Sequence, residues 1–183
     1  MPNLSRLFFL IEFAVMHAFV RLAKDTVEEF IRNGTTIQRP SDLPPDMETE
    51  AGVFVSLKIK GQLRGCIGTF LPTTENVAEE IIHNAISAAT RDPRFLPVSE
   101  GELADLEYSV DVLSEPEKIN TKKELDPKKY GVIIKSGERK GLLLPDLEGV
   151  NTVDEQISVV SMKAGIYVGE PIELYRFEVK RYK

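Results

Sequence analysis

The sequence predicts an α+β fold in which pairs of antiparallel strands alternate with helices. Two alternating apolar runs, residues 53–59 and 62–68, flank a Lys-Gly turn and are typical of a β-hairpin. A second hairpin is predicted where residues 132–135 and 141–144 flank a Ser-Gly turn. Strands joined by such tight turns pair antiparallel, and their alternation with helices places the chain in the α+β class.

Apolar residues at helical spacing predict three helices. The first covers residues 17–33 and ends at Gly34, whose missing Cβ suits a helix C-terminus. The second begins near Thr73 or Thr74, either of which can cap it, and ends before a proline. The third begins at Thr152, where a glutamate three residues later completes a capping box.

Two further strands are predicted at residues 106–113 and 172–180. Between them, residues 115–128 form a charged connection with two prolines and no apolar period. We therefore expect residues 16–183 to form one domain, with the connection at 115–128 as the only suitable boundary between two lobes.

The N-terminal segment, residues 1–15, is apolar at residues 7–11 and carries Arg6 before that run, as a signal peptide does. The run is short, Glu12 interrupts it, and no small-residue cleavage site follows. It also falls far short of the ~20 apolar residues that a membrane helix needs. We therefore predict either a helical extension that packs on the body or an over-extended gene start, with Met16 as the native initiator.

Composition narrows the class of function. The chain has 183 residues, a net charge of −6 and a single cysteine. The acidic balance disfavours a nucleic-acid-binding surface, and one cysteine excludes an intramolecular disulfide and suits a reducing cytoplasm. The sequence carries none of the common nucleotide, metal or serine-hydrolase motifs, so we predict no cofactor and no metal site. We expect a cytoplasmic protein that does not enter a membrane.

The second strand of the first hairpin carries the only thiol of the chain, Cys66. Side chains alternate between the two faces of a strand. One face receives Leu63, Gly65 and Ile67, and the other receives Arg64, Cys66 and Gly68. The Arg64 guanidinium can lower the pKa of Cys66 and make it a nucleophile, whereas the alternative is a small buried hydrophobic residue.

Two groups of charged residues can lie near this thiol. If the strand at 106–113 pairs beside the hairpin, Glu107 and Asp111 lie on the face that carries Arg64 and Cys66. The second group follows the second helix and consists of Arg91, Asp92 and Arg94. These groups can orient a polar ligand or supply acid–base chemistry. The alternative is an ion-pair network that ties a loop to the sheet.

The hexapeptide Leu63-Arg64-Gly65-Cys66-Ile67-Gly68 resembles the signature of the AMMECR1 domain family. The resemblance extends over nearly the whole chain, from about His17 to the C-terminus. It continues in the order of the family through residues 84–95, 109–113, 129–132, 141–147 and 173–177. The resemblance implies an α+β fold with two lobes and a cleft between them.

The resemblance also implies how the protein acts. In prokaryotes such domains are often encoded with, or fused to, a MEMO-type protein and a radical SAM protein. We therefore expect an accessory or ligand-binding component that acts with these partners, and a small molecule is a further candidate ligand. The alternative is an enzyme in its own right that uses Arg64 and Cys66 with Glu107 and Asp111.

The candidate site follows from both lines of reasoning. Cys66 is the candidate catalytic residue. The candidate ligand-binding residues are Arg64, Gly65, Gly68, Arg91, Asp92, Arg94, Glu107 and Asp111. We expect Arg64→Ala to impair function more than stability. The chain departs from many family members at Ser161, where they place a cysteine, and this argues against chemistry that needs two thiols.

Overall fold

The computed structural model describes residues 16–183. The N-terminal segment, residues 1–15, for which we expect an extension or an over-extended start, lies outside the described residues. The chain divides into two compact units. Unit 1 runs up to Val112 and includes the last three residues, Arg181–Lys183, whereas unit 2 comprises Leu113–Lys180. Within residues 16–183, no helix has both the length and the apolar character required to cross a membrane.

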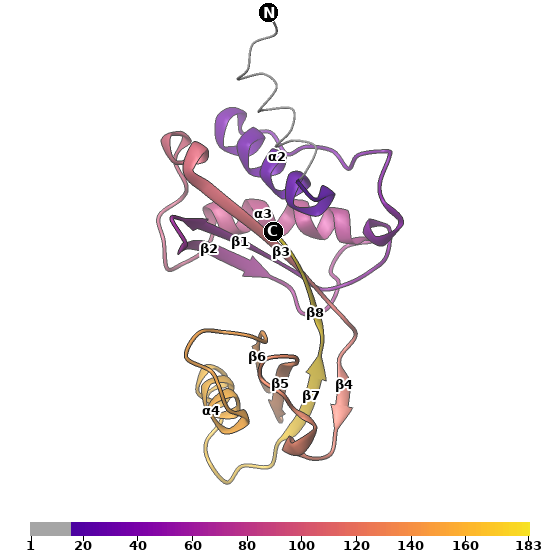
Figure 1. Ribbon diagram of the computed structural model, residues 1–183, viewed down its shortest axis with the longest axis vertical. Coiled ribbons are helices and arrows are strands. Elements are labelled where there is room, and N and C mark those ends of the chain that lie inside the picture. Colours follow the sequence, from indigo (N-terminus) through magenta and orange to yellow (C-terminus); the bar gives the residue numbers. More distant parts are fainter. Residues whose placement is uncertain (1–15) are drawn as a thin grey trace, which may run out of the picture. The chain divides into compact units, whose positions relative to one another are not determined.

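Unit 1 contains a four-stranded sheet with the strand order β2-β1-β3-β8 (Figure 1). Its strands are β1 (Val53–Ile59), β2 (Gln62–Gly68), β3 (Leu106–Leu113) and β8 (Val179–Tyr182). β1 pairs antiparallel with β2 on one side and with β3 on the other. The helices of this unit are α2 (Ala18–Asn33) and α3 (Val77–Thr90), with short 3-10 helices η1 (Pro45–Met47) and η2 (Glu100–Asp105).

One face of this sheet packs against α3, and α2 packs on α3 in turn. Val53, Val55 and Leu57 alternate along β1 and are fully buried in the core that α3 shares. Gly65 of β2 faces the same helix, and a Cβ at this position would lie only 2.2 Å from the Ala88 carbonyl oxygen. Glycine is therefore required for α3 to approach β2 this closely.

The N-terminus of α3 differs from the expectation that Thr73 or Thr74 caps it. The cap is Asn76, whose side chain accepts a hydrogen bond from a backbone N–H of the first turn. Thr73 and Thr74 instead donate to Glu80, a residue with only 1% of its surface exposed. Burial raises the pKa of Glu80, but hydrogen bonds from Thr69, Thr73 and Thr74 outweigh burial and leave the pKa below its usual value.

Unit 2 contains a second four-stranded sheet, with the order β4-β7-β5-β6. Its strands are β4 (Glu117–Ile119), β5 (Gly131–Ser136), β6 (Arg139–Leu143) and β7 (Glu173–Phe177), and all pairs are antiparallel. The helix α4 (Val153–Ala164) packs on β5 and β6, and the 3-10 helix η3 (Lys122–Glu124) follows β4. Thr152 caps α4 in a capping box with Glu155, as predicted.

The predicted α+β class is confirmed, because the structure combines two antiparallel sheets with helices that pack on them. The final strand differs from the prediction: residues 172–180 are divided between β7 and β8, which belong to different sheets. The break falls at Glu178, whose N–H donates to the Ser114 hydroxyl rather than to a strand partner. The charged connection at 115–128 contains β4 and η3.

Candidate functional site

Strand β2 contains a β-bulge at Arg64, whereas the sequence predicts a regular alternation of side chains between the two faces of this strand. Leu57 pairs with Gly65, but the next residue, Lys58, pairs with Leu63. One residue of β2 therefore has no partner in β1. This shift moves Leu63 to the face that carries the thiol, so the expectation that Leu63 shares a face with Gly65 is wrong. Leu63 is accordingly 40% exposed.

The residue in the bulge, Arg64, holds the loop after α3, residues 91–99, which we call the motif loop. Its Nε and Nη2 donate to the two carboxylate oxygens of Glu102, at 2.6 and 3.1 Å. Its Nη1 donates to the Leu96 carbonyl oxygen at 2.9 Å, and Nη2 donates to the Pro97 carbonyl oxygen at 3.3 Å. The hydrogen bonds from Arg64, and then that from a loop N–H, lower the pKa of Glu102 to about 2.

A second ion pair fixes the beginning of the motif loop. Asp92 is only 4% exposed, and its Oδ2 accepts a hydrogen bond from the Cys66 N–H at 2.8 Å. Arg94 donates to both carboxylate oxygens of Asp92, at 2.9 and 2.7 Å, and to the Cys66 carbonyl oxygen at 3.2 Å. The hydrogen bonds from Arg94 outweigh burial and hold the pKa of Asp92 far below its usual value. Because β2 is the outermost strand, Asp92 and Arg94 take the place of a neighbouring strand along its edge.

The thiol of Cys66 is partly buried between these elements. The hydroxyl of Ser56, its partner across the hairpin, donates to Sγ at 3.1 Å. Burial raises the pKa of Cys66; Ser56 and Arg94 oppose this effect, whereas Asp111 and Asp92 add to it. The net result is a raised pKa, so the group is a neutral thiol near pH 7 and a weak nucleophile. The cation that acts on it is Arg94, not Arg64 as expected.

The register between β1 and β3 places Glu107 and Asp111 on the face of the sheet that carries Cys66. Asp111 is 4% exposed and forms a two-pronged ion pair with Arg181 of β8, at 2.7 and 2.8 Å. Glu107 accepts a hydrogen bond from the Gly61 N–H at 3.1 Å. No three His, Cys, Asp or Glu side chains within residues 16–183 are placed to share a metal ion.

Two residues of this network, Glu102 and Arg181, were not among the sequence candidates. A signal for Glu102 is present in the chain, because Ser99 and Glu102 have the spacing of a capping box. The partner of Arg181 lies 70 positions earlier in the chain, and no local pattern links them. Glu102 pairs with Arg64, and Arg181 pairs with Asp111, so each belongs to a carboxylate–guanidinium pair of the candidate site.

The motif loop exposes side chains although its backbone is fixed. Leu96 is 84% exposed, and the side chain of Arg94 is 54% exposed. Arg91 is exposed as well, and within residues 16–183 its side chain forms no ion pair. The Arg94 guanidinium also lies 5.5 Å from the centroid of the Phe95 ring. The outer side of the loop therefore combines one large apolar side chain with two guanidinium groups.

Comparisons with known proteins match nearly the whole chain. The model of a family described as AMMECR1 matches residues 20–182. A protein of Thermotoga maritima is 52% identical over 170 residues, which cover 91% of this chain and 98% of that protein. Protein CA_C1420 of Clostridium acetobutylicum is 51% identical over 167 residues, which cover 90% of this chain and 36% of that longer protein.

A solved structure resembles the whole fold. The crystal structure of the uncharacterized protein PH0010 from Pyrococcus horikoshii superimposes with a TM-score of 0.82 at 33% sequence identity. The match covers 89% of this chain and 88% of that one. The arrangement of elements described above is therefore shared with an archaeal protein.

Proposed function

Because the chain belongs to the AMMECR1 family, we propose that it is an accessory binding protein that docks a partner protein through the motif loop. One observation carries this proposal. Arg64 and Asp92 fix the backbone of the loop, yet Leu96 is 84% exposed. Because the backbone of the loop is already fixed, little backbone conformational freedom is lost when a partner covers it. Arginine is enriched at binding hot spots, and Arg91 and Arg94 lie in the same loop as Leu96.

The contacts of the candidate site argue against catalysis by Cys66. Burial raises the pKa of its thiol, which leaves little thiolate at neutral pH. Arg64, the expected activating group, is engaged by Glu102 and by loop carbonyl oxygens. Asp111, a candidate acid–base group, is engaged by Arg181. Arg64 thus supports the motif loop, and Asp111 joins β3 to β8 through Arg181.

The partners we propose are those implied by the family resemblance, a MEMO-type protein and a radical SAM protein, and we propose that they meet this chain in the cytoplasm. The Clostridium relative supports the idea of a physical association, because the matched region is only 36% of that protein. In that relative the domain is covalently joined to further polypeptide. A domain that works beside another protein can be encoded as a separate chain or as part of a longer one.

The proposal can be tested by measuring the affinity of the purified chain for the MEMO-type and radical SAM proteins of the same organism. We expect Leu96→Asp to weaken binding to the partner by at least about tenfold, because it places a charge in the centre of the contact. Leu71→Asp is the matched control, since Leu71 is also exposed, at 49%, but lies outside the motif loop. Failure of either partner to bind, or equal binding by wild type and Leu96→Asp, would contradict the proposal.

A further inference from the structure

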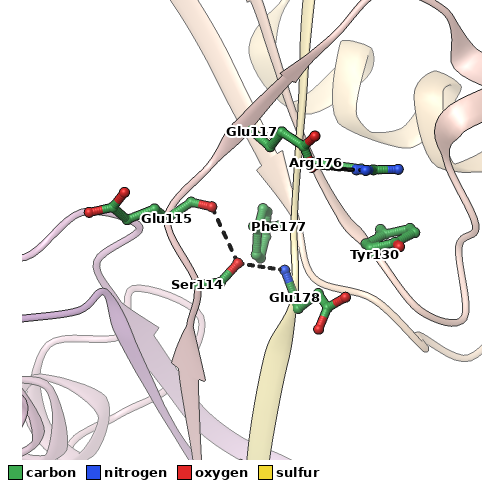
Figure 2. Close-up of a pocket in the computed structure, with 7 residues that line it drawn as sticks. All are labelled: Ser114, Glu115, Glu117, Tyr130, Arg176, Phe177 and Glu178. Carbon is green, nitrogen blue, oxygen red and sulfur yellow. Dashed lines mark hydrogen bonds and ion pairs between the residues drawn. The ribbon is translucent and has the colours of Figure 1, made fainter.

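A pocket of about 180 Å³ in unit 2 is lined by polar groups that bond to one another (Figure 2). Arg176 donates to Glu117 at 2.9 Å. The Glu178 N–H donates to the Ser114 hydroxyl at 2.9 Å, and that hydroxyl donates to the Glu115 carbonyl oxygen at 3.3 Å (Figure 2). The most exposed apolar side chains of unit 2 lie outside this pocket.

These apolar side chains gather at the end of α4 and in the connection from α4 to β7, residues 165–172, which we call the α4–β7 loop (Figure 1). Met162, in the last turn of α4, and Tyr167 are each 77% exposed. Val168 is fully exposed, and Ile172 is 41% exposed. Apolar side chains that gather on the surface of a soluble protein commonly mark an interaction site.

The backbone of the α4–β7 loop is fixed. The Glu170 N–H donates to the Tyr167 carbonyl oxygen at 3.2 Å and closes a β-turn, in which Gly169 has the positive φ, 93°, of the third position of a type II turn. The Glu170 carboxylate accepts the Tyr167 N–H at 2.8 Å. Arg139 donates to this carboxylate and to the Gly165 carbonyl oxygen. Little backbone freedom is therefore lost when another molecule covers the loop.

The charges around these apolar side chains are balanced. Glu138 and Arg139 lie where β6 begins, Lys163 lies beside Met162, and Glu170 lies in the loop, so two cations accompany two carboxylates. The surface thus has no excess charge that would select an acidic or a basic partner. Two copies of a chain with a net charge of −6 repel each other least where the local charge is zero, and there the cations of one copy can meet the carboxylates of the other.

We propose that a second copy of this chain covers the α4–β7 loop, in a symmetric dimer in which Tyr167 of each copy packs on Val168 of the other. A two-fold axis uses the same surface twice, so two neighbouring apolar residues in one turn can complement each other across it. An aromatic side chain buries about 150–250 Å², so four partly exposed side chains provide less than the ~800 Å² per partner of a standard interface. We therefore expect a reversible dimer with a Kd in the micromolar range.

This surface is separate from the motif loop, which belongs to unit 1. The proposal therefore goes beyond docking of a partner protein through the motif loop and does not depend on it.

The test is sedimentation velocity of the full chain at concentrations from about 1 µM to 1 mM, which span the expected Kd. We expect the sedimentation coefficient to rise from that of a monomer to that of a dimer. The Kd should not increase when salt is added, because salt screens the repulsion between the two acidic chains. In ¹H–¹⁵N NMR spectra, the amide signals of Tyr167 and Val168 should shift with protein concentration, whereas those of the motif loop should not.

Val168→Asp should raise the Kd at least about tenfold, because it places two like charges near the two-fold axis. The fold should be unaffected, since the Val168 side chain is fully exposed, and circular dichroism checks this. Leu71→Asp is the matched control, because Leu71 is an exposed leucine of unit 1, outside the motif loop, and its variant should dimerise as wild type does.

Several results would overturn the proposal. A chain that stays monomeric over the whole range has no such dimer. A dimer that persists in Val168→Asp uses another surface, such as the apolar residues 7–11. A dimer that dissociates in high salt is held by charges. Weaker binding of a MEMO-type or radical SAM protein by Val168→Asp, with no change in dimerisation, would assign the α4–β7 loop to that protein instead.

Discussion

Two loops of this protein, one in each unit, are held by the same arrangement of charged groups. In the motif loop, Arg64 donates to a loop carbonyl oxygen and to Glu102, and Glu102 also accepts a loop N–H. In unit 2, Arg139 donates to the carbonyl oxygen of Gly165 and to Glu170, which accepts the N–H of Tyr167. Both arrangements fix the backbone of a loop that exposes large apolar side chains.

The two arrangements differ in burial. The Arg64 side chain is 16% exposed, whereas that of Arg139 is 45% exposed. The carboxylate partners differ less and in the opposite direction, since Glu102 is 30% exposed and Glu170 is 24% exposed. The motif loop also has a second pair, in which the Asp92 side chain is 2% exposed. Exposed ion pairs contribute little to stability, but removal of one partner from a buried pair leaves a desolvated charge. We therefore expect the pairs of Arg64 and Asp92 in unit 1 to stabilise their loop more than the Arg139–Glu170 pair stabilises the loop of unit 2.

The largest effect is expected for Asp92→Ala. We expect it to lower the free energy of unfolding by about 3 kcal/mol, because the backbone N–H groups of Cys66 and Arg94 both lose their acceptor. Asp154→Ala is the control, since that carboxylate is 79% exposed in its pair with Lys122 and should contribute little. Urea denaturation followed by circular dichroism measures both variants. Equal losses would contradict the assignment of the buried pair.

A smaller effect, of about 2 kcal/mol, is expected for Arg64→Ala, because Glu102 and two loop carbonyl oxygens lose their donor. Arg139→Ala should cost much less in the same urea experiment. This differs from the expectation that Arg64→Ala impairs function more than stability, because the sequence did not reveal the contacts of Arg64 with the motif loop. An Arg139→Ala variant as unstable as Arg64→Ala would show that burial does not separate the two loops.

The pH dependence of the stabilisation by the Arg64–Glu102 pair tests whether Glu102 is the partner that matters for Arg64. The folded pKa of Glu102, about 2, lies below its ordinary value of 4.5, so the stabilisation is complete above pH 4.5 and is lost as the pH falls toward 2. The difference in unfolding free energy between wild type and Arg64→Ala should therefore shrink by roughly half between pH 7 and pH 3. Urea denaturation at both pH values measures it. A difference that stays constant would mean that Glu102 is not the partner that matters.

Local patterns in the sequence predicted most elements of the fold. The hairpin turns and the capping box at Thr152 each depend on residues close together in the chain. The pairing of β3 beside β1, assumed from the order of elements, puts Glu107 and Asp111 on the face of Cys66. These features could be predicted because the periodicity of strands and helices depends on residues that are close together in the sequence.

The contacts that define the candidate site could not be predicted from local patterns in the sequence. The bulge at Arg64 has no marker in the alternation of β2, and it becomes visible only in the register with β1. The pairing of Asp92 with the Cys66 backbone depends on β2 being an edge strand, which is a property of the whole sheet. The Asp111–Arg181 pair joins positions 70 residues apart. Tertiary structure sets all three contacts.

The central claim is that the signature residues build the motif loop and do not activate the thiol. The pH dependence of alkylation of the folded protein by iodoacetamide tests it most directly, because Cys66 is the only cysteine. We expect slow alkylation at neutral pH that rises only above the ordinary thiol pKa of about 8.5, since burial raises the pKa of Cys66. Fast alkylation with a midpoint well below pH 8.5 would contradict the claim and would indicate an activated nucleophile.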